Sequence, residues 1–260
     1  LLHSRVVTAD PNAHQMQWID IGCNLGHESF DRDRCDVVAR AADVGVEQLI
    51  LTGASVAGSE RALTLARQEP GRLHATAGVH PHLAAEVDDD AIQRLCRLHA
   101  DTLTVAVGEC GLDYFRDIAP RDVQKRAFER QLALAEACGK PVFLHQRDAH
   151  PDFRAILAEF RDRLGPVVVH CFTDTRRAMF EYLDLDCHIG ITGWICDERR
   201  GGELKAIVPA IPGDRLMLET DAPYLKPRNL RPKARTHRNE PRWLPWIGGT
   251  VAALRGVSPV

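Results

Sequence analysis

Two stretches of this chain repeat one design, and this repetition restricts the fold more than any other feature. Lys140-Pro-Val-Phe-Leu-His145 and Gly165-Pro-Val-Val-Val-His170 each enter through a proline, continue as apolar residues and end on a histidine. A short apolar run bounded by turn residues indicates a strand buried on both faces, as in a parallel sheet. We therefore expect both histidines at the C-terminal ends of buried strands.

Strands and helices alternate along the chain. Hydrophobic periodicity predicts strands at 17–22, 46–52, 73–79, 103–108, 141–145, 166–170, 187–191 and 215–219. It predicts helices at 31–44, 59–69, 88–99, 121–137, 152–163, 175–183, 198–208 and 241–254. Strict alternation implies parallel strands joined by right-handed crossovers, and eight such units close into an α/β fold of the (β/α)8 TIM-barrel type.

The alternative fold is an open doubly wound sheet. That fold usually has a Gly-rich phosphate-binding turn after its first strand. Here the corresponding stretch, Gly22-Cys-Asn-Leu-Gly-His27, lacks the GxGxxG pattern. The barrel is therefore the favoured architecture.

The length of 260 residues and the 45% hydrophobic content suit one barrel domain, at 16–260. Residues 1–15 are irregular, and Met16 directly precedes the first predicted strand. We therefore expect 1–15 to be a disordered or expression-derived tail with no part in the fold. No run of 18 apolar residues occurs, so neither a membrane span nor a membrane partner is expected.

Charge and cysteine content narrow the class of protein. The formal net charge is −3, so a nucleic-acid ligand would need a local basic patch or a metal. The cysteines are scattered singly, without a CxxC pair, at positions 23, 35, 96, 110, 138, 171, 187 and 196. We expect reduced cysteines in the core of a cytoplasmic protein.

Histidines and carboxylates follow six of the eight predicted strands, which is unusual for ordinary strand ends. In a barrel these ends form one face, where catalytic residues lie. The residues concerned are Asp20 and Asn24, His80 and His82, Glu109 and Asp113, His145, Arg147, Asp148 and His150, His170, and Glu219 and Asp221.

This pattern has the chemistry of a metal site. Two imidazoles and a carboxylate on rigid strand ends can bind a divalent cation and leave positions open for water and substrate. A carboxylate such as Glu109 can also bridge two ions, and Asp221 can bind metal or accept a proton from water.

Structural roles are the alternative for several of these residues taken singly. Asp221 could be a turn residue, and His80 and His82 could cap the third strand. Glu219 could pair with an arginine at the edge of the core. The charged run 197–200 could be the solvated start of a helix.

Several motifs in fixed order resemble the TatD family of metal-dependent deoxyribonucleases, from about residue 18 to 245. They are Asp20-Ile-Gly-Cys-Asn-Leu25, Gly78-Val-His-Pro-His82, Gly108-Glu-Cys-Gly-Leu-Asp113, Phe143-Leu-His145, Val169-His-Cys-Phe172, Ile189-Gly-Ile-Thr-Gly193, Glu219-Thr-Asp-Ala-Pro-Tyr-Leu225 and Arg238-Asn-Glu-Pro241. The block Trp194-Ile-Cys-Asp-Glu-Arg-Arg-Gly201 also fits.

The resemblance implies an amidohydrolase-type barrel and a 3′-5′ exonuclease that acts on single-stranded DNA, with RNA as a second substrate. It implies Mg2+ as cofactor, with Mn2+ or Zn2+ as alternatives, and no obligate protein partner. By matching motifs, Glu109, His145 and His170 would bind metal. Asp221 would be a ligand or the catalytic base, and His80 would lie near the scissile phosphate.

One departure weakens the expected metal binding. Many relatives carry His-x-His after the first strand, where this chain has Gly22 and Asn24. We therefore expect one firm site, at Glu109, His145 and His170, and a weak second site near Glu109 and Asp221. The resemblance also implies that the chain ends before the family's usual final helix.

Substrate contacts are expected at the rim of the same face. Phe172, Trp194 and Tyr224 are candidates for stacking on a terminal base. Arg147, Arg199 and Arg200 are candidates for backbone contacts, and His82, like His80, could donate to the phosphate or to the leaving oxygen.

Two other functions use the same residues. A hydrolase of another ester or amide could use the same ligands on the same barrel. Such enzymes usually have the His pair after the first strand, so its absence favours the phosphodiesterase. A non-catalytic binding protein with a decayed site is the third hypothesis.

Overall fold

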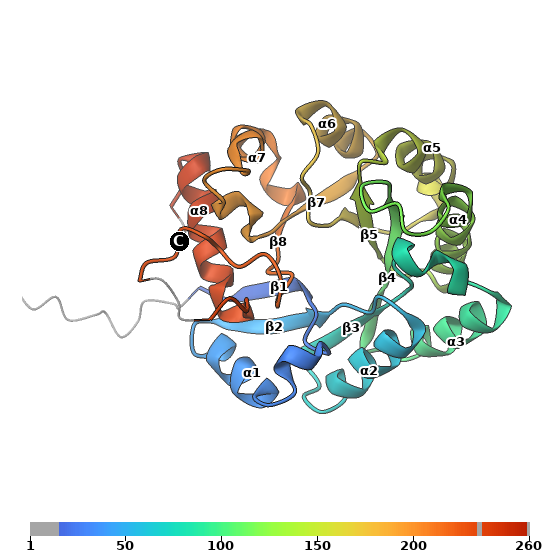
Figure 1. Cartoon of the computed structure of the whole chain (residues 1–260), viewed down its shortest axis with the longest axis horizontal. Coiled ribbons are helices and arrows are strands. Elements are labelled where there is room, and N and C mark those ends of the chain that lie inside the picture. Colours follow the sequence, from blue (N-terminus) through green and yellow to red (C-terminus); the bar gives the residue numbers. More distant parts are fainter. Residues whose placement is uncertain (1–15, 233–235, 259–260) are drawn as a thin grey trace, which may run out of the picture.

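The computed structural model describes residues 16–232 and 236–258, and the expectation for 1–15 lies outside this range. Eight parallel strands form one sheet in the order β1 to β8, each paired with its neighbours in sequence. Helices surround the strands on the outside (Figure 1). The predicted (β/α)8 barrel is confirmed.

The strands lie close to their predicted positions. They are β1 Trp18–Cys23, β2 Val46–Leu51, β3 Leu73–Ala77, β4 Thr104–Asp113, β5 Val142–Arg147, β6 Val167–Val169, β7 Cys187–Ile191 and β8 Leu216–Leu218. The α-helices are α1 Arg34–Ala42, α2 Val56–Ala66, α3 Asp89–His99, α4 Arg121–Cys138, α5 His150–Phe160, α6 Arg176–Asp184, α7 Gly202–Ile207 and α8 Leu244–Arg255. Short 3-10 turns are η1 Glu28–Phe30, η2 Pro81–Glu86, η3 Arg161–Arg163, η4 Gly193–Cys196, η5 Val208–Ala210, η6 Gly213–Arg215 and η7 Pro241–Trp243.

Strand β4 was predicted to end at Gly108, and this prediction is wrong, because the strand continues to Asp113. Gly108 has φ +135°, and a Cβ there would lie 2.0 Å from the carbonyl oxygen of Phe143. Only glycine permits this close approach of β4 to β5. The approach carries Glu109 to the side of His145.

The helix predicted at 198–208 is also shorter than expected. Residues 197–200 form a turn, and α7 begins only at Gly202. The buried Asp197 carboxylate accepts hydrogen bonds from the backbone N–H groups of Arg199 and Arg200, at 2.9 and 3.2 Å. The run is therefore a turn organised by a buried acid, and the prediction of a solvated helix start is wrong for Asp197.

The core lies between the strands and the outer helices. Its largest cluster joins β4 to β8 with α4 to α8 and includes the fully buried Phe128, Phe153 and Tyr182. Cys23, Cys110, Cys187 and Cys196 are buried and free, as predicted. Cys35 and Cys96 are exposed on α1 and α3, so the prediction that all the cysteines are in the core is wrong for these two. Within the described ranges, no helix has the length and apolar character needed to cross a membrane.

The seam between β1 and β8 is closed by few backbone contacts. Cys23 and Ala222 form an isolated parallel bridge. Asp221 N–H donates to the Gly22 carbonyl at 2.8 Å, and Asn24 N–H donates to the Ala222 carbonyl at 2.7 Å. Helix α8 contacts both strands from the outside (Figure 1).

The segment between β8 and α8 is fixed to α1 by an ion network. Arg238 binds Asp33 through two contacts of 2.7 Å and also binds Glu240 at 3.0 Å. Arg40 binds Asp33 at 3.0 Å and Glu240 at 3.0 Å. Asn239, which directly precedes Glu240, donates its side-chain amide to the carbonyl of Thr220. The network therefore anchors the loop that carries Asp221.

Asp33→Asn is expected to lower the free energy of unfolding by about 1–3 kcal/mol, because it leaves two partly buried arginines with one acid fewer. Hydrogen bonds from Arg238 and Arg40 hold the pKa of Asp33 well below its usual range. Since the folded pKa lies below the unfolded value of about 3.9, this stabilisation is complete above the unfolded pKa, declines below it, and is lost as the pH falls through the folded pKa.

Urea denaturation at pH 7 and at pH 3 measures the effect. Asp31→Asn is the matched control, because Asp31 pairs with Arg61 at 2.6 Å but its side chain is 50% exposed. The control should leave the stability close to that of the parent, because an exposed ion pair contributes little. A deficit in Asp33→Asn that does not shrink at low pH would contradict this account of the network.

Candidate active site

Glu109 is the centre of the site, at the C-terminal end of the barrel. Its Oε1 lies 3.0 Å from His145 Nδ1, 2.9 Å from His170 Nε2 and 3.5 Å from His80 Nε2. The Glu109 side chain is only 9% exposed. Three strand ends therefore direct imidazoles at one carboxylate oxygen.

Asp113 supports His145 from the side opposite Glu109. Its Oδ2 lies 3.3 Å from His145 Nε2 and 2.9 Å from His82 Nε2. Its Oδ1 accepts the backbone N–H of Arg116 at 2.8 Å. Asp113 is buried, so this acid is a fixed part of the site.

Glu219 supports His170 in the same way. Its Oε2 lies 3.3 Å from His170 Nδ1, and its Oε1 accepts the backbone N–H of Cys171 at 2.5 Å. The prediction that Glu219 pairs with an arginine is wrong. A Cβ at Gly22 would lie 2.3 Å from Glu219 Oε2, so the carboxylate fills the space beside the glycine.

His80 has a different environment from the other two imidazoles. Its Nδ1 accepts the backbone N–H of His82 at 3.1 Å and thereby caps η2. Burial lowers the pKa of His80 to about 3, so the ring is neutral at pH 7. A neutral ring that accepts at Nδ1 carries its proton on Nε2. His80 is therefore a hydrogen-bond donor towards the centre of the site.

Asp221 lies where β8 meets β1. Its Oδ1 accepts the side-chain amide of Asn24 at 2.8 Å, and no hydrogen bond to Oδ2 occurs among the residues that the structure describes. Its backbone carbonyl accepts Tyr224 N–H at 2.9 Å, so the residue also makes the expected turn. Burial and the nearby Glu109 and Glu219 charges raise the pKa of Asp221 to about 7.

The charged groups at the centre compensate one another. Burial alone would raise the pKa of Glu109, but the charge of His170 and the hydrogen bonds of His145 and His170 hold it well below its usual range. Burial alone would lower the pKa of His145, and Asp113 and Glu109 raise it instead. For His170, Glu219 and Glu109 likewise overcome burial and raise the pKa well above its ordinary value.

Two groups of side chains bring ligand atoms within 4.8 Å of one another. They are His80, Glu109 and His145, and His80, His82 and Asp113. His170 contacts the first group through Glu109. Among the described residues, neither group includes Asp221. The donors are of the types that bind divalent metals.

The structure separates the residues expected at the rim. Tyr224 is exposed, Trp194 is half-buried, Arg147 stacks on Phe115 at 3.8 Å and Arg199 is exposed. Phe172 is 2% exposed and belongs to the main core cluster, so its expected role in base stacking is wrong. Its ring lies 6.3 Å from that of the buried Tyr182 on α6.

Gly22→Ala is expected to reduce the free energy of unfolding by about 1–3 kcal/mol, because the new methyl group must displace the buried Glu219 carboxylate. Gly249→Ala in α8 is the control, since a Cβ there meets nothing within 4 Å, and it should be neutral or stabilising. Urea unfolding followed by circular dichroism measures both. The loss should shrink in a Glu219→Ala background, and an unchanged loss there would show that the clash is elsewhere.

The eight-stranded barrel, with imidazoles and carboxylates at its C-terminal end, has the architecture and the donor groups of a metal-binding barrel enzyme. The profile of the TatD related DNase family matches residues 19–260. The chain belongs to this family.

Relatives and solved structures agree with this assignment. The chain is 50% identical to the 3′-5′ ssDNA/RNA exonuclease TatD of Erwinia billingiae (strain Eb661), over 92% of each chain. It is 48% identical to the 3′-5′ ssDNA/RNA exonuclease TatD of Cronobacter sakazakii (strain ATCC BAA-894), over 92% of this chain and 91% of the relative. The crystal structure of the TatD homologue YJJV from Escherichia coli K12 superposes with a TM-score of 0.84 at 28% identity, over 93% of this chain and 92% of the homologue.

Proposed function

We propose that this protein is a metal-dependent 3′-5′ exonuclease that hydrolyses phosphodiester bonds in single-stranded DNA, with RNA as a second substrate. The observation that carries the proposal is the convergence of His145 and His170 on one oxygen of Glu109 at the open end of the barrel. Relatives that share about half of the sequence are named as ssDNA/RNA exonucleases.

Hydrogen bonding supports Glu109, His145 Nδ1 and His170 Nε2 as metal ligands. Each imidazole faces Glu109 with one nitrogen and a buried acid with the other, Asp113 for His145 and Glu219 for His170. A metal-binding histidine commonly donates its second N–H to a carboxylate in this way.

Glu109 Oε1 lies at a suitable donor spacing from each imidazole taken singly, but Glu109, His145 and His170 do not form a group whose ligand atoms all lie within 4.8 Å of one another. Two atoms that each lie about 2.1 Å from a metal, at right angles, are about 3.0 Å apart. The distances from Glu109 Oε1 to His145 Nδ1 and His170 Nε2 are 3.0 and 2.9 Å. Mg2+ is the ion that the family resemblance implies, and imidazole donors suit Mn2+ or Zn2+ at least as well.

His80 and Asp221 supply proton chemistry around this centre. A bound divalent ion would polarise a phosphate oxygen and lower the pKa of its water. Asp221 Oδ2 is available to orient that water and accept its proton, while Asn24 holds Oδ1. His80 Nε2–H is available to donate to a phosphate or leaving oxygen. His80 is therefore a donor to the substrate in this proposal and not a metal ligand.

A nuclease assay on purified protein tests the proposal. Single-stranded DNA and RNA oligonucleotides labelled at either end are incubated with Mg2+, Mn2+ or Zn2+, or with a chelator. We expect metal-dependent release of mononucleotides from the 3′ end and no turnover after chelation. Equal degradation with and without metal, or turnover of a dihydropyrimidine or a carboxylic ester in place of DNA, would overturn it.

A further inference from the structure

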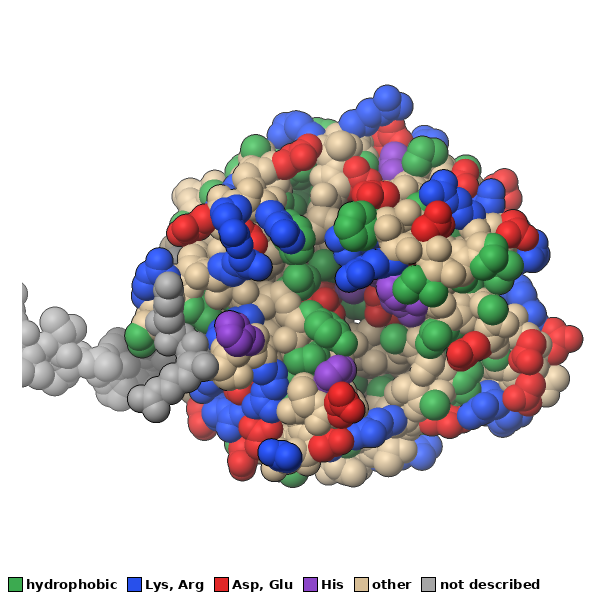
Figure 2. Space-filling model, in the orientation of Figure 1, with side chains coloured by type: hydrophobic (Ala, Val, Ile, Leu, Met, Phe, Trp, Pro, Cys, Tyr) green, Lys and Arg blue, Asp and Glu red, His purple; other side chains and the backbone are tan. Residues whose placement is uncertain are grey.

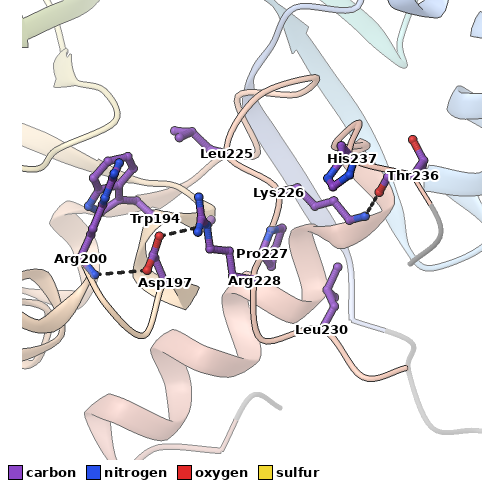
Figure 3. Close-up of a pocket in the computed structure, with 11 residues that line it drawn as sticks. Trp194, Asp197, Arg200, Leu225, Lys226, Pro227, Arg228, Leu230, Thr236 and His237 are labelled. Carbon is purple, nitrogen blue, oxygen red and sulfur yellow. Dashed lines mark hydrogen bonds and ion pairs between the residues drawn. The ribbon is translucent and has the colours of Figure 1, made fainter. Parts of the chain in front are cut away.

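A cavity of about 580 Å³ lies on the strand-end side of the barrel, between the segments that follow β7 and β8. Figure 3 shows side chains from both segments pointing into it. Its lining includes Trp194, Asp197, Arg200, Lys226, Arg228 and His237. Its volume is in the range that accepts a nucleotide-sized ligand.

The cavity has a basic lining. Arg200, Lys226 and Arg228 face a single acid, Asp197. That acid is already occupied, because Oδ1 accepts two backbone N–H groups and Oδ2 binds Arg228 Nε at 3.1 Å. Asp197 therefore holds Arg228 in place, and the cavity keeps an excess of positive charge in a protein whose net charge is −3.

Arg200 and Trp194 offer planar groups at the same wall. The Arg200 guanidinium lies over the Trp194 ring, 6.0 Å from its centre (Figure 3). Among the residues that the structure describes, the Arg200 guanidinium makes no hydrogen bond or ion pair. An exposed arginine without a protein acceptor beside a half-buried tryptophan suits a ligand with phosphate and an aromatic base.

The cavity adjoins the candidate active site along the chain. Leu225, in its lining, is four residues beyond Asp221, so their Cα atoms are at most about 14 Å apart. Asn239 fixes this segment by donating to the carbonyls of Thr220 and Tyr224, at 2.9 and 2.7 Å. Figure 2 shows Lys and Arg side chains gathered beside the hollow in which His and acidic side chains are visible.

We propose that this cavity binds the single-stranded nucleic acid at a nucleotide remote from the cleaved bond, with a phosphate at Arg200, Lys226 and Arg228 and a base against Trp194. The inference rests on the proposed nuclease function and adds a consequence to it. Substrates long enough to occupy both places bind more tightly than a dinucleotide, which reaches only the metal centre.

Arg200→Gln and Trp194→Leu test the cavity with substrates of two lengths. For a single-stranded 12-mer, each substitution is expected to raise KM about tenfold with little change in kcat. For a dinucleotide, the change in kcat/KM is expected to be much smaller. Arg97→Gln is the control, because Arg97 is exposed on α3 and its guanidinium makes no hydrogen bond or ion pair among the described residues. The control should match the parent on both substrates.

Binding without turnover separates this inference from the nuclease proposal. Fluorescence anisotropy of a labelled 12-mer in the presence of a chelator reports affinity alone. We expect Arg200→Gln to bind the 12-mer more weakly than the parent. The slope of log affinity against log salt concentration should fall by about 1, as for the loss of one phosphate contact. If the parent cleaves no nucleic acid but Arg200→Gln still binds the 12-mer more weakly than the parent, the nuclease proposal is rejected and the cavity is retained as a binding site. If Arg200→Gln binds the 12-mer as the parent does, or if kcat/KM falls equally on the 12-mer and the dinucleotide, the cavity is rejected as a binding site.

Discussion

Glu109→Gln is expected to lower kcat/KM on single-stranded DNA by about 10³-fold or more, because the amide removes the negative charge that would hold the metal and that faces both imidazoles. Glutamine keeps the shape of the side chain, so the fold should survive. Steady-state cleavage of a 3′-labelled oligonucleotide measures the loss, and calorimetric titration with Mn2+ measures the accompanying loss of metal affinity.

Glu181→Gln is a matched control for this substitution. Glu181 also contacts an imidazole, His150 Nε2 at 2.8 Å, but it lies on α6 outside the cluster around Glu109. Its replacement should change activity by less than about twofold, as expected for a surface pair. A Glu109→Gln protein that cleaves DNA and binds Mn2+ as the parent does would remove Glu109 from the mechanism.

Asp113→Asn is expected to weaken metal binding about 10–100-fold, with a matching fall in activity at limiting metal. The acid accepts from His145 Nε2 at 3.3 Å and so fixes which nitrogen of that ring faces Glu109. Asparagine can still accept the Arg116 N–H through Oδ1, so the local turn should remain.

The readout that identifies a positioning role for Asp113 is the response to metal concentration. Activity of Asp113→Asn should approach that of the parent when Mn2+ is raised about 100-fold, because the ligands themselves are intact. A deficit that persists at saturating metal would instead place Asp113 in contact with the substrate or the reacting atoms. Thermal unfolding of both proteins checks that the fold is unchanged.

The fold could be predicted from the sequence because each strand is a short apolar run and each crossover contains a helix. The one large error, the end of β4, has a physical cause. Periodicity stops at Gly108, where β4 approaches β5 so closely that no side chain fits, yet the strand continues beyond it. A glycine followed directly by a buried carboxylate was the available signal.

The metal ligands could be proposed from the sequence, but their supporting acids could not be assigned. Asp113 and Glu219 are separated from their histidines by 32 and 49 residues. Only the barrel geometry shows that each faces the far nitrogen of its imidazole. The base-stacking role predicted for Phe172 is wrong for a similar reason, since the sequence places Phe172 after a strand end but does not show that its ring is buried in the core.

The few contacts that close the barrel between β1 and β8 also place a residue of the proposed site. Asp221 and Asn24 provide two of the closing contacts, through Asp221 N–H to Gly22 and Asn24 N–H to Ala222. Barrel closure and placement of the proposed proton acceptor therefore depend on the same contacts. A barrel left open between β1 and β8 would keep its histidines and still lack Asp221 in its place beside Asn24.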